Sequence, residues 1–205
     1  MATNMALKRA RKAQRRKRVL AERRRAEALD ASLSGRALRA ARMPIQHCLL
    51  TESLFDIGMG TLVLARGVTP RHVSFGSFLI DVFCLGIKDV TFESVEGEAF
   101  EMFMDAMDAA SPMAPADPSY ARKLLRDLAA WSQSMGFAPH RDFAAVEQIF
   151  GDVNADASDA LLRFGRDGRP FYIPGPNDTP SLVRRRIEHL KEHLGNDGFG
   201  LESAA

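Results

Sequence analysis

The chain has few of the features that mark secreted and membrane proteins. Its 205 residues include only two cysteines, Cys48 and Cys84, which is too few for a disulfide framework. No stretch approaches the roughly eighteen consecutive apolar residues of a membrane span. The N-terminus carries charge but no apolar segment, which excludes a secretory signal peptide. These absences predict a cytoplasmic protein with reduced thiols.

The first 42 residues lack aromatic side chains and are poor in acidic ones. They hold 14 Lys and Arg against 3 Asp and Glu, whereas the rest of the chain holds 14 and 23. Residues 5–30 contain no Gly or Pro and are rich in Ala, Arg, Lys and Glu, so helix is the local preference. A helix over these residues would have only a narrow stripe of apolar side chains, and its cations would repel one another. We therefore expect a basic helical or disordered arm over residues 1–43 and one globular domain over residues 44–205.

This arm predicts a polyanion partner. Its three clusters of cations can each neutralise backbone phosphates, which gives salt-sensitive binding without sequence specificity. The arm has no aromatic residue, so it cannot stack on bases. Our first hypothesis is a non-enzymatic cytoplasmic protein that binds RNA or another polyanion. The expected contact residues are Lys8, Arg9, Arg11, Lys12, Arg15, Arg16, Lys17, Arg18, Arg23, Arg24 and Arg25.

A structural or protein-interaction module with no nucleic-acid role is an alternative hypothesis. In that case the basic arm docks on the acidic residues of the body, around Asp105 and Asp108. Opposite charges on the two parts of one chain favour such docking.

The globular part is predicted to form around a β-hairpin. Residues 61–66 are a short apolar run, residues 68–72 include a Thr-Pro turn, and residues 73–85 read as a long strand. Alternate side chains of a strand face opposite sides of a sheet. Phe75, Ser77, Leu79, Asp81 and Phe83 should therefore share one face, and the other face should carry Gly76, Phe78, Ile80, Val82 and Cys84.

The remaining chain mixes helical and strand periodicity. Apolar residues at every third or fourth position predict helices, and short apolar runs bounded by Gly or Pro predict strands. An Asp-Gly pair at 167–168 predicts a hairpin turn. We expect an α+β domain with a small antiparallel sheet and helices packed mainly on one face. The predicted strands are residues 45–50, 90–95, 161–164, 171–173 and 199–201, and the predicted helices are residues 96–110, 118–135, 141–150 and 180–194.

Five segments resemble those of an uncharacterised family of bacterial proteins with no settled activity. The resemblance extends over roughly two thirds of the chain and implies one folded unit from about Pro44 onwards, but no catalytic residue. The segments are IQHCLL at 45–50, GMGTLVLARG at 58–67, FGSFLIDVFCLGIKD at 75–89, MGFAPHRDF at 135–143 and FGRDGRPFYIPGPND at 164–178.

Cys84 is the candidate for an enzymatic alternative. A thiolate nucleophile needs a nearby base and a group that lowers its pKa. His47, His72 or His140 could be the base, and Asp81 or Asp89 could orient it. With Cys84, His47 and Asp81 as the set singled out, the protein would be a cysteine-dependent hydrolase or transferase using Cys84. A cysteine in an apolar strand more often packs as a small hydrophobe. His47, Cys48, Cys84 and His140 lack the spacing of metal ligands, so we expect no metal and no cofactor.

Overall fold

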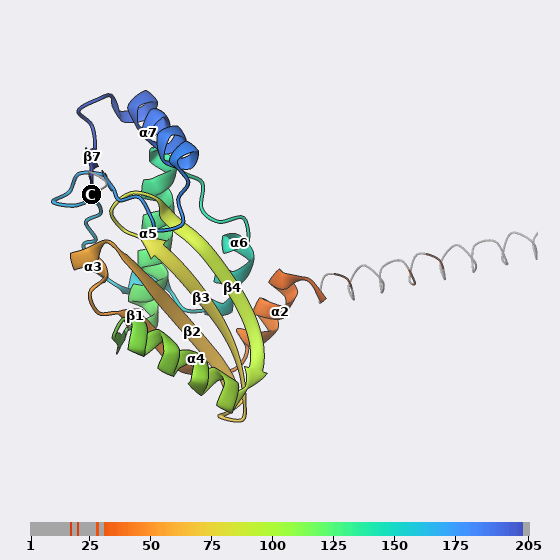
Figure 1. Ribbon diagram of the computed structural model, residues 1–205. Coiled ribbons are helices and arrows are strands. Elements are labelled where there is room, and N and C mark those ends of the chain that lie inside the picture. Colours follow the sequence, from red (N-terminus) through yellow and green to blue (C-terminus); the bar gives the residue numbers. More distant parts are fainter. Residues whose placement is uncertain (1–16, 18–19, 21–27, 29–30, 203–205) are drawn as a thin grey trace, which may run out of the picture.

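The computed structural model in Figure 1 describes residues 31–202 and the single residues Lys17, Leu20 and Ala28. Lys17 is exposed. The other predicted contact residues of the arm lie outside the described residues.

A five-stranded antiparallel sheet forms the centre of the fold, with strand order β4-β3-β2-β1-β5. All neighbouring strands of this sheet pair antiparallel, and helices pack on its faces, which confirms the predicted α+β class. Within the described residues, no helix is long and apolar enough to cross a membrane. The strands are β1 (Ile45–Thr51), β2 (Met59–Thr69), β3 (His72–Asp81), β4 (Gly86–Glu96), β5 (Met113–Pro115), β6 (Phe171–Tyr172) and β7 (Gly200–Leu201). The helices are α2 (Leu33–Ala40), α3 (Leu54–Ile57), α4 (Gly97–Ala110), α5 (Pro118–Ser134), α6 (Phe143–Val146), η1 (Glu147–Phe150), η2 (Ala155–Ala157) and α7 (Pro180–Leu194).

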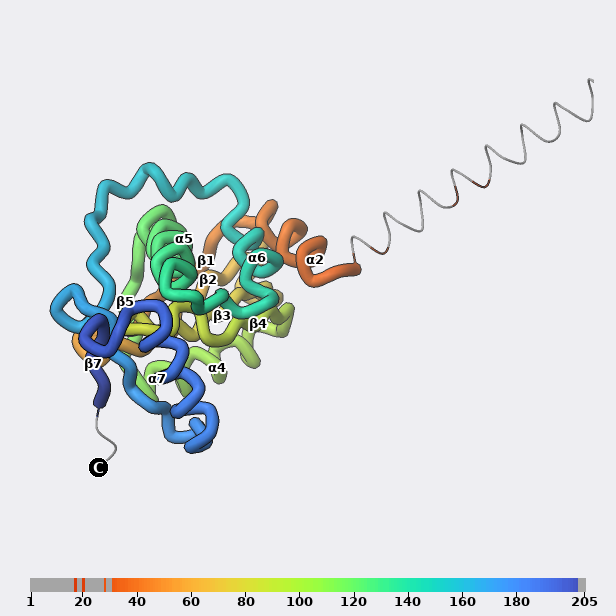
Figure 2. Tube along the Cα trace, turned by 90° about the horizontal axis from the view of Figure 1, so that it is seen from above, coloured from red at the N-terminus to blue at the C-terminus, as the bar shows by residue number. Residues whose placement is uncertain are grey.

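The β2–β3 hairpin shows the predicted alternation of side chains. Phe75 lies 5.2 Å from Phe100 of α4 in a small core on one face. Phe78 and Ile80 belong to the larger core on the other face, with side chains from α2, α5 and α6. Figure 2 shows α4 and α5 on opposite sides of the sheet. Most helices therefore cover one face, as predicted, and α4 covers the other.

The second strand of the hairpin is shorter than predicted. It ends at Asp81, whose Oδ1 accepts hydrogen bonds from the backbone N–H groups of Phe83 and Cys84, both at 2.9 Å. Residues 82–85 consequently form a turn into β4. Gly86 follows with φ +74°, and a Cβ there would lie 2.2 Å from the Ser132 hydroxyl. Cys84 thus lies in a turn, and the predicted strand 73–85 is wrong beyond Asp81.

The globular domain begins before the predicted boundary at residue 44. The Ser32 hydroxyl caps α2 by accepting from the Gly35 N–H at 3.1 Å. Ala37 and Ala40 of this helix lie in the main core. The buried Arg66 holds the next residues by donating to the Met43 carbonyl at 2.7 Å. Short α2, which lies before residue 44, therefore packs as part of the folded body.

A buried ion pair fixes the segment that follows α5. Arg122 of α5 and Glu147 of η1 are both buried, and their side chains pair at 2.7 Å. Arg126 donates to the same carboxylate at 2.8 Å. Arg122 also donates to the carbonyls of Gly151 and Val153. The predicted helix over residues 141–150 is present as α6 followed by η1.

The C-terminal hairpin prediction is correct for its turn, but only its second strand is present, as β6. Asp167 and Gly168 both have positive φ, and Arg166 and Arg169 form a single antiparallel bridge across them. Among the described residues, 161–164 form no strand. Instead, β6 pairs in parallel with β7. The turn docks on the 82–85 segment, where the Gly165 N–H donates to the Val82 carbonyl.

Candidate anion-binding cleft

A cleft of about 410 Å³ lies between the start of β4, the loop after α5 and the side of α7. It brings together parts of the chain that are far apart in sequence, including the segments 75–89 and 135–143. Its lining residues are Leu85, Ile87, Lys88, Gly136, Phe137, Ala138, His140, Leu182, Arg185, Arg186 and His189.

The cleft lining is cationic. It contains Lys88, Arg185 and Arg186 but no Asp or Glu. Among the described residues no carboxylate forms a contact ion pair with Lys88, whose Nζ contacts the Met59 sulfur at 3.9 Å, although its charge acts on Asp81 and Asp178 from farther away. Arg185 is exposed. Lys88 and Arg185 line this concave surface, and neither forms a contact ion pair with a carboxylate of the described residues. The cleft therefore favours an anion.

Arg186 is held in place by Asp178. Their side chains form an ion pair, and Asp178 also accepts from the Gly175 N–H at 2.9 Å and the Tyr172 hydroxyl at 3.1 Å. Burial alone would raise the pKa of Asp178, but the Gly175 hydrogen bond, the Arg186 charge and the Tyr172 hydroxyl outweigh it and lower that pKa. Arg186 is therefore a positioned cation whose charge is partly offset.

We expect Asp178→Asn to reduce the free energy of unfolding by about 1–2 kcal/mol at pH 7. The folded-state pKa of Asp178 lies below its ordinary value of 3.8. Its ionised form therefore stabilises the fold above that value, and the contribution is lost as pH falls through the folded-state pKa. Urea unfolding at pH values from 7 down to 3 measures the free energy of unfolding of both proteins. The difference between the original protein and Asp178→Asn should become smaller below about pH 4. The exposed Asp167→Asn is the control, and a difference that does not change with pH would contradict the assignment.

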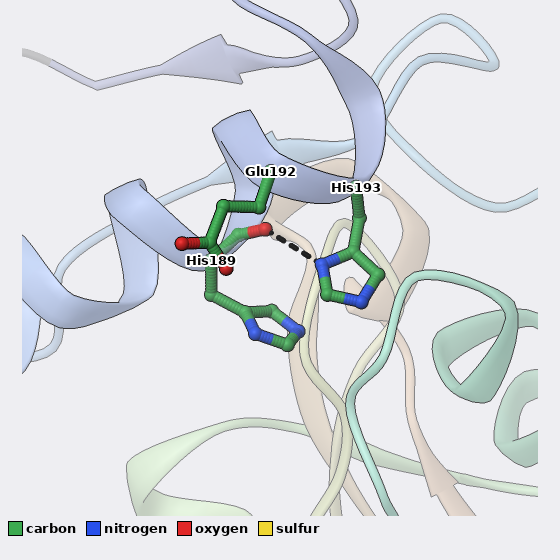
Figure 3. Close-up of side chains that lie close together, drawn as sticks. All are labelled: His189, Glu192 and His193. Atoms are coloured by element: carbon green, nitrogen blue, oxygen red, sulfur yellow. Dashed lines mark hydrogen bonds between the residues drawn. The ribbon is translucent and has the colours of Figure 1, made fainter.

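Three side chains at the end of α7 have the chemistry to hold a divalent metal ion. His189, Glu192 and His193 each offer a ligand atom, and these atoms lie within 4.8 Å of one another (Figure 3). His193 Nδ1 lies 2.9 Å from the His189 carbonyl oxygen, and His189 Nε2 lies 3.1 Å from that of Met135. Imidazole nitrogens and a carboxylate are ligands that suit an ion such as Zn²⁺. The sequence analysis missed this group, although its H-x-x-x-H spacing in HLKEH was visible.

The structure brings Asp81 to Cys84 but leaves His47 elsewhere. Cys84 is fully buried beside Leu85 and Tyr172. His47 is exposed on β1, and its ring packs 5.5 Å from Phe100 on the α4 face. Burial first, and then the Asp81 charge, raise the pKa of the Cys84 thiol, while Arg186 opposes the rise. The geometry therefore does not assemble the three residues of the enzymatic alternative, and it favours a packing role for Cys84.

We expect both cysteines to react slowly with iodoacetamide in the folded protein. Burial raises the pKa of Cys48 to about 12, with a smaller contribution from Asp117. At pH 7.5 both thiols should alkylate on the order of a thousandfold more slowly than in urea, because the thiolate is the reacting form. Mass spectrometry of timed samples measures both rates, and urea-unfolded protein is the control. Rapid labelling of Cys84 alone would instead support the enzymatic alternative.

The sequence matches no protein-family model, and no match was found among curated proteins or among solved structures. The resemblance to a bacterial family therefore stays a prediction. The case for function rests on the cleft and on the charge distribution of the chain.

Proposed function

We propose that this protein is a non-enzymatic, cytoplasmic binder of RNA or another polyanion. Residues 8–25 of the basic arm supply eleven Lys and Arg for this binding, and the cleft supplies a phosphate site on the folded body. The observation that carries this proposal is the set of cations in the cleft, which has no carboxylate in its lining. The two free, buried cysteines are consistent with a reducing compartment.

The cleft cations stand out because the body around them is acidic. Beyond residue 42 the chain has 23 acidic residues against 14 Lys and Arg. Many of those cations are engaged elsewhere, as in the Arg122–Glu147 pair. Lys88, Arg185 and Arg186 nevertheless gather on one concave surface. A local positive potential on an acidic body is a feature that an anionic partner explains.

The proposal is tested by titrating a fluorescently labelled single-stranded RNA with the full chain and with residues 31–205. The shorter chain keeps the Ser32 cap and therefore the α2 helix. Fluorescence anisotropy reports the affinity of each chain. Equal affinities of the two chains for RNA would refute the role of the arm. Separately, the ratio of absorbance at 260 nm to that at 280 nm shows whether the purified full chain carries nucleic acid.

A protein-interaction role is the second candidate, because α4 presents an acidic surface. Glu98, Glu101, Asp105 and Asp108 are all exposed, and no described residue forms an ion pair with them. Asp108 only accepts a hydrogen bond from the Met113 N–H. The basic arm of the same chain is the complementary occupant of this surface. Crosslinks from the arm to α4 that vanish on adding RNA would join the two roles, whereas crosslinks that persist in saturating RNA would favour docking alone.

A further inference from the structure

We propose that the cleft is a site for a single nucleotide, with the phosphate on Lys88 and Arg185 and the base against Phe137. This inference rests on the phosphate-binding role proposed above for the cleft. It names the ligand class, a nucleoside monophosphate either free or at the end of a strand.

The size of the cleft is suited to one nucleotide. Its volume of about 410 Å³ lies toward the lower end of small-molecule pockets, which span roughly 300–1,000 Å³. A longer strand would have to continue outside it, over the exposed surface of α7. The cleft therefore fits one unit of a nucleic acid.

The cleft lining has a cationic part for a phosphate and an apolar part for a base, as a nucleotide requires. Leu182 provides apolar surface and Phe137 adds an aromatic ring, whereas Leu85 and Ile87 also line the cleft but are only 7% and 2% exposed. The Phe137 ring packs 4.8 Å from the His189 ring, which limits its freedom. Bases stack on such rings, and the contact is worth about 1–3 kcal/mol per base in single-strand binders. The arm lacks any aromatic residue, so the cleft adds a base contact that the arm cannot make.

Two features hold the walls of the cleft in place without a ligand. Asp178 and Tyr172 fix Arg186, so its remaining N–H groups are positioned before an anion arrives. Gly136 has φ +82°, and a Cβ there would lie 2.5 Å from His189 Nε2 and 2.7 Å from His193 Nε2. Only glycine lets this loop approach α7 so closely. The cleft is therefore a preformed site, as expected for small-molecule binding.

Isothermal titration calorimetry of the full chain with AMP, adenosine and inorganic phosphate tests the inference. AMP should bind at least about tenfold more tightly than either half of the molecule, because it engages both parts of the lining. Lys88→Ala and Arg185→Ala should each weaken AMP binding about tenfold. Arg184→Ala is the matched control, since Arg184 neighbours Arg185 on α7 but lines a different groove. Phosphate binding as tight as AMP, or AMP binding unaffected by both variants, would overturn the inference.

The same variants separate this inference from the proposed function. If the RNA titration stays arm-dependent while AMP does not bind, the nucleotide site is refuted and the polyanion role stands. If AMP binds and Lys88→Ala weakens its binding, while RNA does not bind at all, the nucleotide site stands and the polyanion role fails. Arg185 is exposed, so its replacement does not endanger the fold.

Discussion

Deleting residues 1–30 should lower the affinity for single-stranded RNA by at least about a hundredfold at 50 mM salt. The deletion removes eleven Lys and Arg in three clusters and leaves the folded body intact from the Ser32 cap onwards. Each phosphate that a cation neutralises releases condensed counterions, and this release drives binding. The residual affinity of residues 31–205 then reports the contribution of the cleft.

Salt dependence gives the same experiment a second, independent readout. If the arm neutralises about six phosphates of a single strand, raising salt from 50 to 200 mM should weaken binding by the full chain about 300-fold. The truncated chain should show a much flatter dependence. A variant with Arg23, Arg24 and Arg25 replaced by Gln is the graded control, and its slope should fall between the two. Binding by the full chain that is insensitive to salt would contradict phosphate recognition.

Glu147→Gln should reduce the free energy of unfolding by about 3–5 kcal/mol. Glu147 is 7% exposed, and its carboxylate faces the buried Arg122 as well as Arg126. Removing its charge leaves the Arg122 guanidinium buried without a counter-ion. Urea unfolding followed by circular dichroism measures the change at pH 7.

The matched control is a partly exposed ion pair on the same helix, whose side chains are 25% and 41% exposed. Lys123 and Asp127 pair at 2.9 Å on α5 with four-residue spacing. Asp127→Asn should cost only about 0.5 kcal/mol, since solvent screens the pair. Similar losses for the two substitutions would show that the Arg122–Glu147 pair contributes no more than a surface contact.

Local patterns in the sequence predicted much of the fold. The alternation at Phe75 and Phe78 places these rings on opposite faces of β3, where the structure has them. Asp117 caps α5 by accepting from the Ser119 and Tyr120 N–H groups, as its position before Pro118 indicates. These features depend on neighbours in the chain, which is why sequence alone reveals them.

The errors occur where distant contacts override local preference. The apolar run 82–85 has the composition of a strand, yet the Asp81 carboxylate turns it, and residues 165–171 then pair with it. β5 lies in a proline-rich stretch and exists because it pairs with β1 at the sheet edge. The cleft was not predicted because its lining comes from three separate segments. Only His189 and His193 carried a local signal that was overlooked.

The parallel pairing of β6 with β7 ties together the two ends of the helix that forms one wall of the cleft. Before α7, the Asp178 carboxylate accepts a hydrogen bond from the Tyr172 hydroxyl. After α7, the Glu202 N–H donates to the Tyr172 carbonyl at 3.0 Å, and the Gly200 N–H donates to the Pro170 carbonyl at 2.8 Å. Residues 170–172 thus form hydrogen bonds to the segment before α7 and to the segment after it. Gly200 and Glu202 therefore help to hold Arg185 and Arg186 in position, although neither of them lines the cleft.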